Sequence, residues 1–318
     1  MHAVVLGAGM SGLASALLLR RAGHDVTVVS DKRVQATTSH LAAAVWFPTA
    51  AGPPEKVGPW GNETYSVLAG EAADGHPGVT MLESLTLYRE EPGEPDWAKS
   101  VRDVRPARPE ELPPGYRHGL RFVVPLVEMP TYLPGLLRRA GSMGVNYVAE
   151  RVHRLDDLLS WRPDLVVNAA GMAAGPLVGD DNTYPVRGQI VRVRNSGLSI
   201  SVRDEKHPGG RAYVHPRSSD CILGGTFDVG EWDDTPDPFE TKSILDRCTD
   251  IVPALAGAEV IESVVGLRPG RPEVRLEIGT ELLPVPVIHN YGHGGSGITI
   301  GWGCAAEVVR LANKSSAS

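Results

Sequence analysis

Three glycines near the start of the chain, Gly7, Gly9 and Gly12, have the spacing of a loop that binds the pyrophosphate of a dinucleotide. An apolar segment at 2–6 precedes them, and a helix is predicted to follow over Leu13–Ala22. Glycines at these positions allow a tight turn, a close approach of pyrophosphate to the backbone, and close packing of helix on strand. The helix N-terminus offers unpaired N–H groups to phosphates. The loop predicts dinucleotide binding and leaves FAD, NAD and NADP open.

An acidic residue stands where the next strand of such a unit ends. The apolar segment 26–29 is predicted to be a strand, and Ser30 and Asp31 follow it. Asp31 lies about 20 residues after Gly12, where a carboxylate can accept a hydrogen bond from a ribose hydroxyl. Strand, glycine loop, helix and second strand therefore occur in the order that a dinucleotide-binding unit requires.

A second glycine cluster lies near the other end of the chain. It follows a predicted strand at 285–290 and opens a predicted helix that contains Ala305 and Val308. The N-terminus of a helix carries a partial positive charge. A reduced flavin is anionic on its pyrimidine edge, whereas nicotinamide gains no anion on reduction, so the cluster favours FAD. Its members are Gly292, Gly294, Gly295, Gly297, Gly301 and Gly303.

The composition argues against several classes of protein. A net charge of −7 over 318 residues argues against nucleic acid as the main partner, which would favour a basic face. The sequence has no apolar run long enough to span a bilayer, and the first strand leaves no room for a signal peptide before it. The three cysteines, Cys221, Cys248 and Cys304, match neither a disulfide framework nor a metal site. We therefore expect a reduced, cytoplasmic protein with no metal and no membrane partner.

The rest of the chain alternates between helical and strand-like patterns. Apolar spacing predicts a helix over 129–141, and residues 236–251 predict another. Residues 36–52 are expected to form an extended loop, and the turn-rich residues 204–210 suggest a mobile lid. Predicted strands lie at 85–88, 121–125, 146–148, 163–171, 189–194 and 221–225.

These patterns predict an α/β fold in which the chain leaves the dinucleotide-binding unit and returns to it at the second glycine cluster. We expect a discontinuous Rossmann-like FAD-binding domain with an inserted antiparallel-sheet α+β substrate domain. The FAD-binding domain is predicted to comprise residues 1–50, 133–188 and 260–318, and the substrate-binding domain residues 51–132 and 189–259.

The C-terminal segment 289–305, which reads His-Asn-Tyr-Gly-His-Gly-Gly-Ser-Gly-Ile-Thr-Ile-Gly-Trp-Gly-Cys-Ala, resembles the signature of the D-amino-acid oxidases. The block 265–277, with Gly-Leu-Arg-Pro, resembles another motif of that family. Residues 37–46, 211–216 and 223–226 resemble its second flavin-contacting loop and its substrate-domain strands. Matching blocks occur from residue 2 to residue 306, so the resemblance covers essentially the whole chain.

The resemblance implies a set of site residues. Arg268 aligns with the arginine that binds the substrate carboxylate, a role that suits the planar two-donor fork of a guanidinium. Tyr213 aligns with a tyrosine that binds the same carboxylate, and the carbonyl of Gly295 with the acceptor for the substrate amine. The implied cofactor-binding residues are Gly7, Ala8, Gly9, Met10, Ser11, Gly12, Asp31, Lys32, Thr38, Ser39, Ala43, Ala44, Val45, Val152, Arg268, Gly294, Gly295, Gly297, Ile298 and Thr299.

Several positions depart from the family pattern. Gly209 stands where mammalian-type members have a lid tyrosine, which argues against lid-gated product release. Phe227 stands where relatives that prefer D-aspartate carry arginine, so we expect a preference for neutral or apolar D-amino acids. His40 replaces an acidic residue, and Gly301 replaces a histidine that many relatives have. His289 and His293 are interpreted as hydrogen-bonded structural residues rather than catalytic ones.

The reaction implied is oxidative deamination of a D-amino acid by dioxygen, giving a 2-oxo acid, ammonia and hydrogen peroxide. Hydride would pass from the α-carbon to N5 of a non-covalently bound FAD, with no residue acting as acid or base. The alternatives are a D-aspartate oxidase, a glycine or sarcosine oxidase, an NAD(P)-dependent dehydrogenase, and a non-catalytic dinucleotide sensor. A homodimer is left open.

Overall fold

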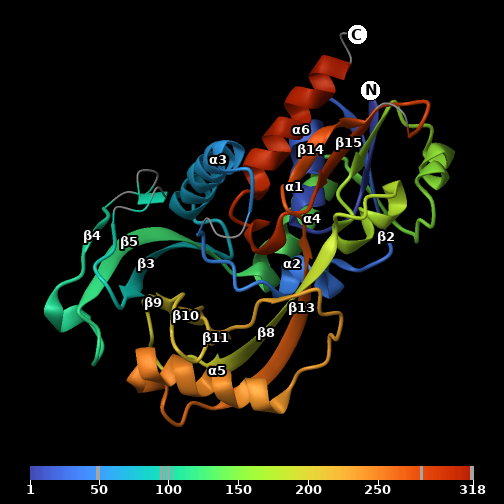
Figure 1. Cartoon of the computed structure of the whole chain (residues 1–318). Helices are drawn as coiled ribbons and strands as arrows, with labels where there is room; N and C mark the ends of the chain where they lie inside the picture. Colours follow the sequence, from blue (N-terminus) through green and yellow to red (C-terminus); the bar gives the residue numbers. More distant parts are fainter. Residues whose placement is uncertain are drawn as a thin grey trace.

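The computed structural model describes residues 1–47, 51–93, 95, 97–98, 101, 103–279 and 282–315. Its strands form two sheets (Figure 1). In the smaller, six-stranded sheet, β1 (His2–Leu6) pairs in parallel with β2 (Asp25–Ser30) and with β7 (Leu165–Asn168). The predicted strand–helix–strand unit is therefore present. The other strands of this sheet are β6 (Asn146–Ala149), β15 (Val287–Tyr291) and the antiparallel edge strand β14 (Arg275–Gly279).

Both faces of the six-stranded sheet are covered, as a parallel sheet requires. Ala3 and Val5 of β1 lie in a core with four helices, whereas Val4 and Leu6 point to the opposite face, where they pack in a second core with the 3-10 helix η4 (Leu155–Trp161). The four helices are α1 (Met10–Arg21), α3 (Pro54–Ala73), α4 (Met129–Ser142) and α6 (Gly301–Ser315).

The larger sheet has nine strands and is mostly antiparallel. Helix α5 (Pro238–Ile251) lies across one of its faces (Figure 1) and shares a core with it through Ile244, Cys248 and Val214. The strands are β3 (Val79–Tyr88), β4 (Arg105–Pro106), β5 (His118–Val127), β8 (Tyr184–Arg194), β9 (Ser201–Asp204), β10 (Ala212–Pro216), β11 (Asp220–Gly224), β12 (Asp228–Val229) and β13 (Val260–Gly270).

Short helical segments connect these elements. They are α2 (Thr38–Leu41) and the 3-10 helices η1 (Val34–Ala36), η3 (Pro109–Glu111), η5 (Gly171–Ala173), η6 (Pro176–Val178), η7 (Pro253–Leu255) and η8 (Gly294–Ser296).

The structure corrects two expectations about local structure. Residues 36–52 are not wholly extended, because α2 lies within them; residues 48–50 of that loop fall outside the described residues. Helix α3 was not predicted, because Pro53, Pro54 and Pro59 suggest a break. Pro54 instead occupies the first turn, where its missing N–H costs little, and Trp60 and Leu68 bury the helix against the core.

Strand pairing also crosses the predicted domain boundaries at two places. β13 pairs with β8 along nearly its whole length, from Val260 with Val193 to Gly270 with Tyr184. Residues 184–188 and 260–270 therefore belong to the larger sheet. The division of the chain into two domains stays a prediction.

Within the described part of the chain, no helix is both long and apolar enough to cross a membrane. The same residues contain no group of three or more His, Cys, Asp or Glu side chains placed to hold a metal ion.

Candidate active site

The first glycine loop forms a cradle that only glycine can build. Gly7 has a left-handed backbone (φ +108°), and a Cβ on it would overlap the carbonyl oxygen of Ala169. A Cβ on Gly12 would overlap the carbonyl oxygen of Gly7. Gly9 faces Ser39, whose Oγ accepts a hydrogen bond from the Met10 amide at 3.1 Å. The N-terminus of α1 thus faces α2, and the first turn of α1 contains no acidic residue.

This cradle fits the pyrophosphate of FAD. The first-turn N–H groups of a helix have no partner within the helix, and Gly9 provides no side-chain cap for α1. Ala8 and Met10 are buried, whereas Gly9 and Ser11 are partly exposed. Because Ser39 Oγ already accepts from the Met10 N–H, the N–H groups of Ser11 and Gly12 are the ones that would hold the phosphates.

The residues predicted to bind adenosine lie at one edge of the six-stranded sheet. Asp31 and Lys32 follow β2 and are exposed, and Val152 follows the neighbouring strand β6 and is partly buried. The Lys32 carbonyl oxygen accepts hydrogen bonds from Ser30 Oγ at 3.0 Å and from the Tyr147 hydroxyl at 3.2 Å. These bonds fix the turn after β2, so that the Asp31 carboxylate remains free to meet a ribose.

The predicted second flavin-contacting loop runs between the two sheets. Thr38 Oγ1 donates to the carbonyl of Leu267 in β13 at 3.1 Å, and the Ala44 carbonyl accepts from the Val127 amide at 2.9 Å. Val45 is buried and forms a bridge to β5, and Ala43 is partly buried. The hydroxyl of Thr299 donates to the Phe47 carbonyl at 3.1 Å, which joins this loop to the second glycine cluster.

The second glycine cluster folds into η8 and then enters α6. Gly292 and Gly294 have left-handed backbones (φ +81° and +55°), which glycine adopts without a Cβ penalty. Gly297 and Ile298 are partly buried, and Gly295 is exposed. The cluster therefore presents backbone rather than side chains, as a segment against a flavin ring must.

Arg268 is held in the larger sheet by two backbone carbonyls and by the Tyr213 hydroxyl. Its Nη1 donates to the carbonyls of Thr226 at 3.2 Å and Arg187 at 3.3 Å, and no carboxylate among the described residues pairs with it. A Cβ on Gly188 would overlap the guanidinium. Burial lowers the pKa of Arg268, yet arginine stays protonated at any physiological pH. A partly buried cation that pairs with no carboxylate among the described residues is suited to receive one from a substrate.

Tyr213 and Gly295 lie beside Arg268. The Arg268 guanidinium donates a hydrogen bond to the Tyr213 hydroxyl, and burial raises the pKa of this tyrosine. Gly224, opposite Tyr213 in β11, leaves room for the ring, because a Cβ there would overlap it. A Cβ on Gly295 would lie 3.8 Å from Arg268 Cδ. The structure thus brings together all three predicted substrate residues.

The two C-terminal histidines are both buried, but only one is hydrogen-bonded. His293 Nε2 lies 2.9 Å from Asn290 Oδ1, so His293 is hydrogen-bonded as expected. The hydrogen bonds expected for His289 are absent: among the described residues, both of its ring nitrogens lack partners, and its ring packs edge-on against Tyr291 with centroids 5.7 Å apart. Its side chain is 0% exposed, so it has no access to a substrate. Burial lowers the pKa of each histidine to about 4.

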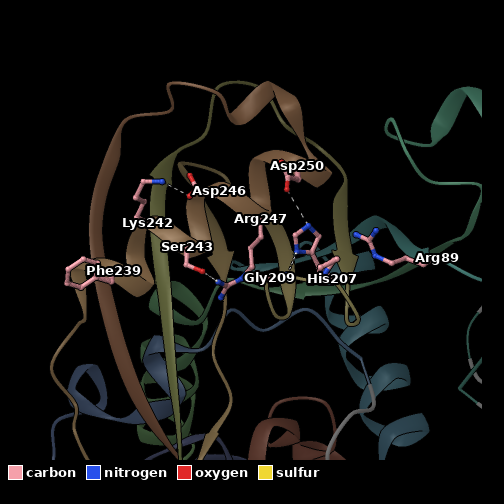
Figure 2. A pocket seen from close by; sticks show the side chains of 10 residues that line it. Arg89, His207, Gly209, Phe239, Lys242, Ser243, Asp246, Arg247 and Asp250 are labelled. Carbon is pink, nitrogen blue, oxygen red and sulfur yellow. Dashed lines mark hydrogen bonds and ion pairs between the residues drawn. The ribbon is translucent and has the colours of Figure 1, made fainter.

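The predicted lid, residues 204–210, is fastened to α5. Arg247 Nε donates to the Arg211 carbonyl at 2.8 Å, and its Nη2 donates to Glu240 at 2.8 Å. Arg247 Nη1 donates to Ser243 at 2.7 Å (Figure 2). His207 Nε2 lies 3.5 Å from Asp250 Oδ2. His207, Ser243, Arg247 and Asp250 line the surface pocket drawn in Figure 2, which contains none of the predicted site residues. The Arg211 side chain does not line this pocket; its Cζ lies 4.3 Å from the ring centroid of Phe227.

Comparison with known proteins places the chain in a family. A family model described as DAO, FAD dependent oxidoreductase, matches residues 2–311. The chain belongs to this family of FAD-dependent oxidoreductases. The match confirms the prediction of FAD as cofactor and of an oxidoreductase.

Curated relatives cover the chain almost completely. A D-amino-acid oxidase of Rubrobacter xylanophilus is 49% identical over 98% of this chain and 95% of its own length. A D-aspartate oxidase of Homo sapiens is 36% identical over 98% of this chain and 94% of its own length. Among solved structures, glycine oxidase from Bacillus cereus has a TM-score of 0.81 at 19% identity and covers 98% of this chain and 97% of its own. This last likeness confirms the α/β fold.

Two features of the site were missed at the sequence level. Gly188 interrupts the strand pattern Val186-Arg187-Gly188-Gln189, and an isolated glycine in a strand indicates close approach of another group. Arg203 of β9 lies opposite Tyr213, is 5% exposed, and has no hydrogen-bond partner for Nε among the described residues. Its Cζ is 3.9 Å from the ring centroid of Phe47.

We predict that Gly188→Ala displaces the Arg268 guanidinium and lowers kcat/KM by about a hundredfold, because a misplaced carboxylate ligand loses its orienting role. FAD content should stay as in the wild type. Gly70→Ala on α3 is the matched control, since nothing lies within 4 Å of a Cβ there. Steady-state kinetics with a D-amino acid and the flavin absorbance of the purified variants provide the measurement. Wild-type kcat/KM in Gly188→Ala would contradict the packing argument.

We also predict that stability falls as pH drops from 6.5 toward 4. His293 and His289 have native pKa values of about 4 against 6.5 when unfolded, so in this range the unfolded chain binds more protons. Their contribution is complete above pH 6.5 and is lost on acidification, up to about 3 kcal/mol for each. Urea unfolding of the wild type and of His289→Leu at pH 7 and pH 5 measures how much His289 contributes to the pH dependence of the free energy of unfolding. If His289→Leu shows the same pH dependence of the free energy of unfolding as the wild type, the prediction is wrong.

Proposed function

We propose that this FAD-dependent oxidoreductase oxidatively deaminates D-amino acids with dioxygen, giving 2-oxo acids, ammonia and hydrogen peroxide. The observation that carries the proposal is the unpaired Arg268 guanidinium next to Tyr213 and Gly295. A dinucleotide sensor needs no such carboxylate clamp. The identity of 49% to a relative named D-amino-acid oxidase supports the same reaction.

The residues of the site act by binding and orienting the substrate. Of the five N–H donors of Arg268, two bind the carbonyls of Thr226 and Arg187 and one binds the Tyr213 hydroxyl, which leaves two to donate to the α-carboxylate. Burial raises the pKa of Tyr213, so its hydroxyl stays protonated at neutral pH and can donate to the same carboxylate. The Gly295 carbonyl would accept from the amine. Carboxylate and amine held at two points fix the orientation of the α-hydrogen.

Bound FAD supplies a two-electron acceptor that dioxygen reoxidises. The glycine loop of α1, the loop 38–45 and the second glycine cluster would hold it without a covalent link. No residue is assigned as acid or base. The homodimer and the cytoplasmic location stay predictions.

The decisive test is an anaerobic absorbance spectrum of the purified protein. D-alanine or D-methionine should bleach the flavin bands, the L-enantiomers should not, and air should restore the bands. Arg268→Ala should retain FAD but bleach more than about a hundredfold more slowly at equal substrate, because it loses a charged hydrogen bond in the binding site. A wild-type flavin that D-amino acids leave oxidised would overturn the proposed reaction, and full activity in Arg268→Ala would remove this residue from the site.

A specific observation also favours the second candidate, a D-aspartate oxidase. Phe227 predicts a preference for neutral substrates, but the structure places Arg211 on its ring and the buried Arg203 opposite Tyr213. Arg211 is partly neutralised by Glu205, whose Oε2 lies 3.5 Å from its Nε. Burial lowers the pKa of Arg203 to about 10, which leaves it charged. Either cation offers a partner for a side-chain carboxylate.

We predict a higher kcat/KM for D-methionine than for D-aspartate, because Phe227 provides an apolar wall. If D-aspartate is used at all, Arg203→Leu should abolish its use and spare D-methionine, since the charge matters only to an acidic side chain. Arg211→Leu is the paired variant that assigns the effect to one cation. The kinetic constants of the three proteins on both substrates decide the question, and a clear D-aspartate preference in the wild type would establish the second candidate.

A further inference from the structure

Four hydrogen bonds, two of them buried and two partly buried, close a ring between the two glycine-rich segments that would hold FAD. Asn290 Nδ2 donates to Ser15 Oγ at 3.2 Å, and Ser15 Oγ donates to the Ser11 carbonyl at 2.7 Å. His293 Nε2 lies 2.9 Å from Asn290 Oδ1, and His293 Nδ1 lies 3.4 Å from Ser11 Oγ. Ser15, Asn290 and His293 are at most 4% exposed. Two segments almost 300 residues apart in sequence are therefore joined by side chains alone.

The chemistry of the donors fixes the direction of every bond in the ring. Because Ser15 gives its only proton to the Ser11 carbonyl, its oxygen can only accept, and the amide of Asn290 must face it with the NH2 group. The amide oxygen of Asn290 then accepts from His293 Nε2–H. A neutral imidazole carries one N–H, so His293 Nδ1 must accept from the hydroxyl of Ser11.

We propose that His293 is a positioning residue that holds the N-terminus of α1 in register with the second glycine cluster, and so sets the affinity of the protein for FAD. The proposal rests on FAD binding by the family and not on the identity of the substrate. Ser11 directs its hydroxyl proton inward to His293, so it can offer only its backbone N–H and oxygen lone pairs outward. His293 also packs on the cluster itself, since a Cβ on Gly297 would lie 3.6 Å from His293 Cβ.

The ring closes only if all of its members are present, so its members should act as a unit. Removal of His293 or of the Ser15 hydroxyl opens the same ring, and the second removal should then add little. A purely local packing role predicts the opposite, namely independent losses that add. Ser15 lies one turn further along α1 than Ser11 and is not among the predicted FAD contacts, so its substitution tests the ring without touching the cofactor.

The test is a double-mutant cycle on FAD affinity with His293→Leu, Ser15→Ala and the double variant. Apoprotein is titrated with FAD, and flavin fluorescence gives the Kd. Each single variant should raise the Kd about tenfold, as expected for lost buried hydrogen bonds, and the double variant should raise it no further. His293→Gln, which can still donate to Asn290, should recover part of the affinity.

The matched control is Ser201→Ala, which removes a buried serine–histidine contact of 2.8 Å to His215 in the other sheet. It should leave the Kd for FAD within about twofold of the wild type.

Additive losses in the double variant, or a wild-type Kd in both single variants, would overturn the proposal. Lower thermal stability of the apoprotein with an unchanged Kd would assign His293 a merely structural role. If His293→Leu does not fold, His293→Gln replaces it in the cycle with Ser15→Ala. Because no substrate is present, a failed deamination assay would not affect this result.

Discussion

Arg268 keeps a positive charge inside the larger sheet, where backbone carbonyls rather than a carboxylate receive its hydrogen bonds. Desolvating an unpaired cation is costly, and the surrounding sheet must be stable enough to tolerate it. The long antiparallel pairing of β13 with β8 provides that stability, since it fixes Arg268 opposite Val186 and leaves Gly188 as the gap for its guanidinium. In the proposed reaction, a substrate carboxylate would gain a strong ion pair, because the cost of desolvating the arginine has already been met during folding.

The FAD cradle depends on the same kind of long-range assembly. The N-terminus of α1 can face phosphates only because Gly7 and Gly12 allow the chain to turn tightly against β7. The flavin end requires the loop at 38–45, which is fixed to β13 through the Leu267 carbonyl. β13 thus takes part in both halves of the site: it carries Arg268 and also anchors the loop predicted to contact the flavin. In the proposed site, one strand would therefore set the distance between the cofactor and the substrate carboxylate.

Sequence patterns predicted those parts of the site whose requirements are local. The glycine loop, the second glycine cluster and helix α4 depend on spacing within short segments, and they were found. Arg268 and Tyr213 could be assigned only through the family resemblance, because nothing near them in sequence marks a carboxylate site. Gly188 and Arg203 were missed, since their importance arises from strand pairing with β13 and β10. Helix α3 was missed because its prolines suggest a break, whereas tertiary burial of Trp60 decides the outcome.

The loop between β9 and β10 has consequences for how the site selects substrates. Gly209 has no side chain that could cover a substrate, and Arg247 and Asp250 of α5 contact the loop from the outside. Arg211 is thereby held on Phe227 by its own backbone. A wall fixed in this way cannot close around each substrate in turn, so discrimination must come from the preformed shape and charge beside Phe227. Rigid sites lose little conformational entropy when they bind a ligand. Here Arg247, which is buried and lies outside the predicted substrate site, holds the loop in place.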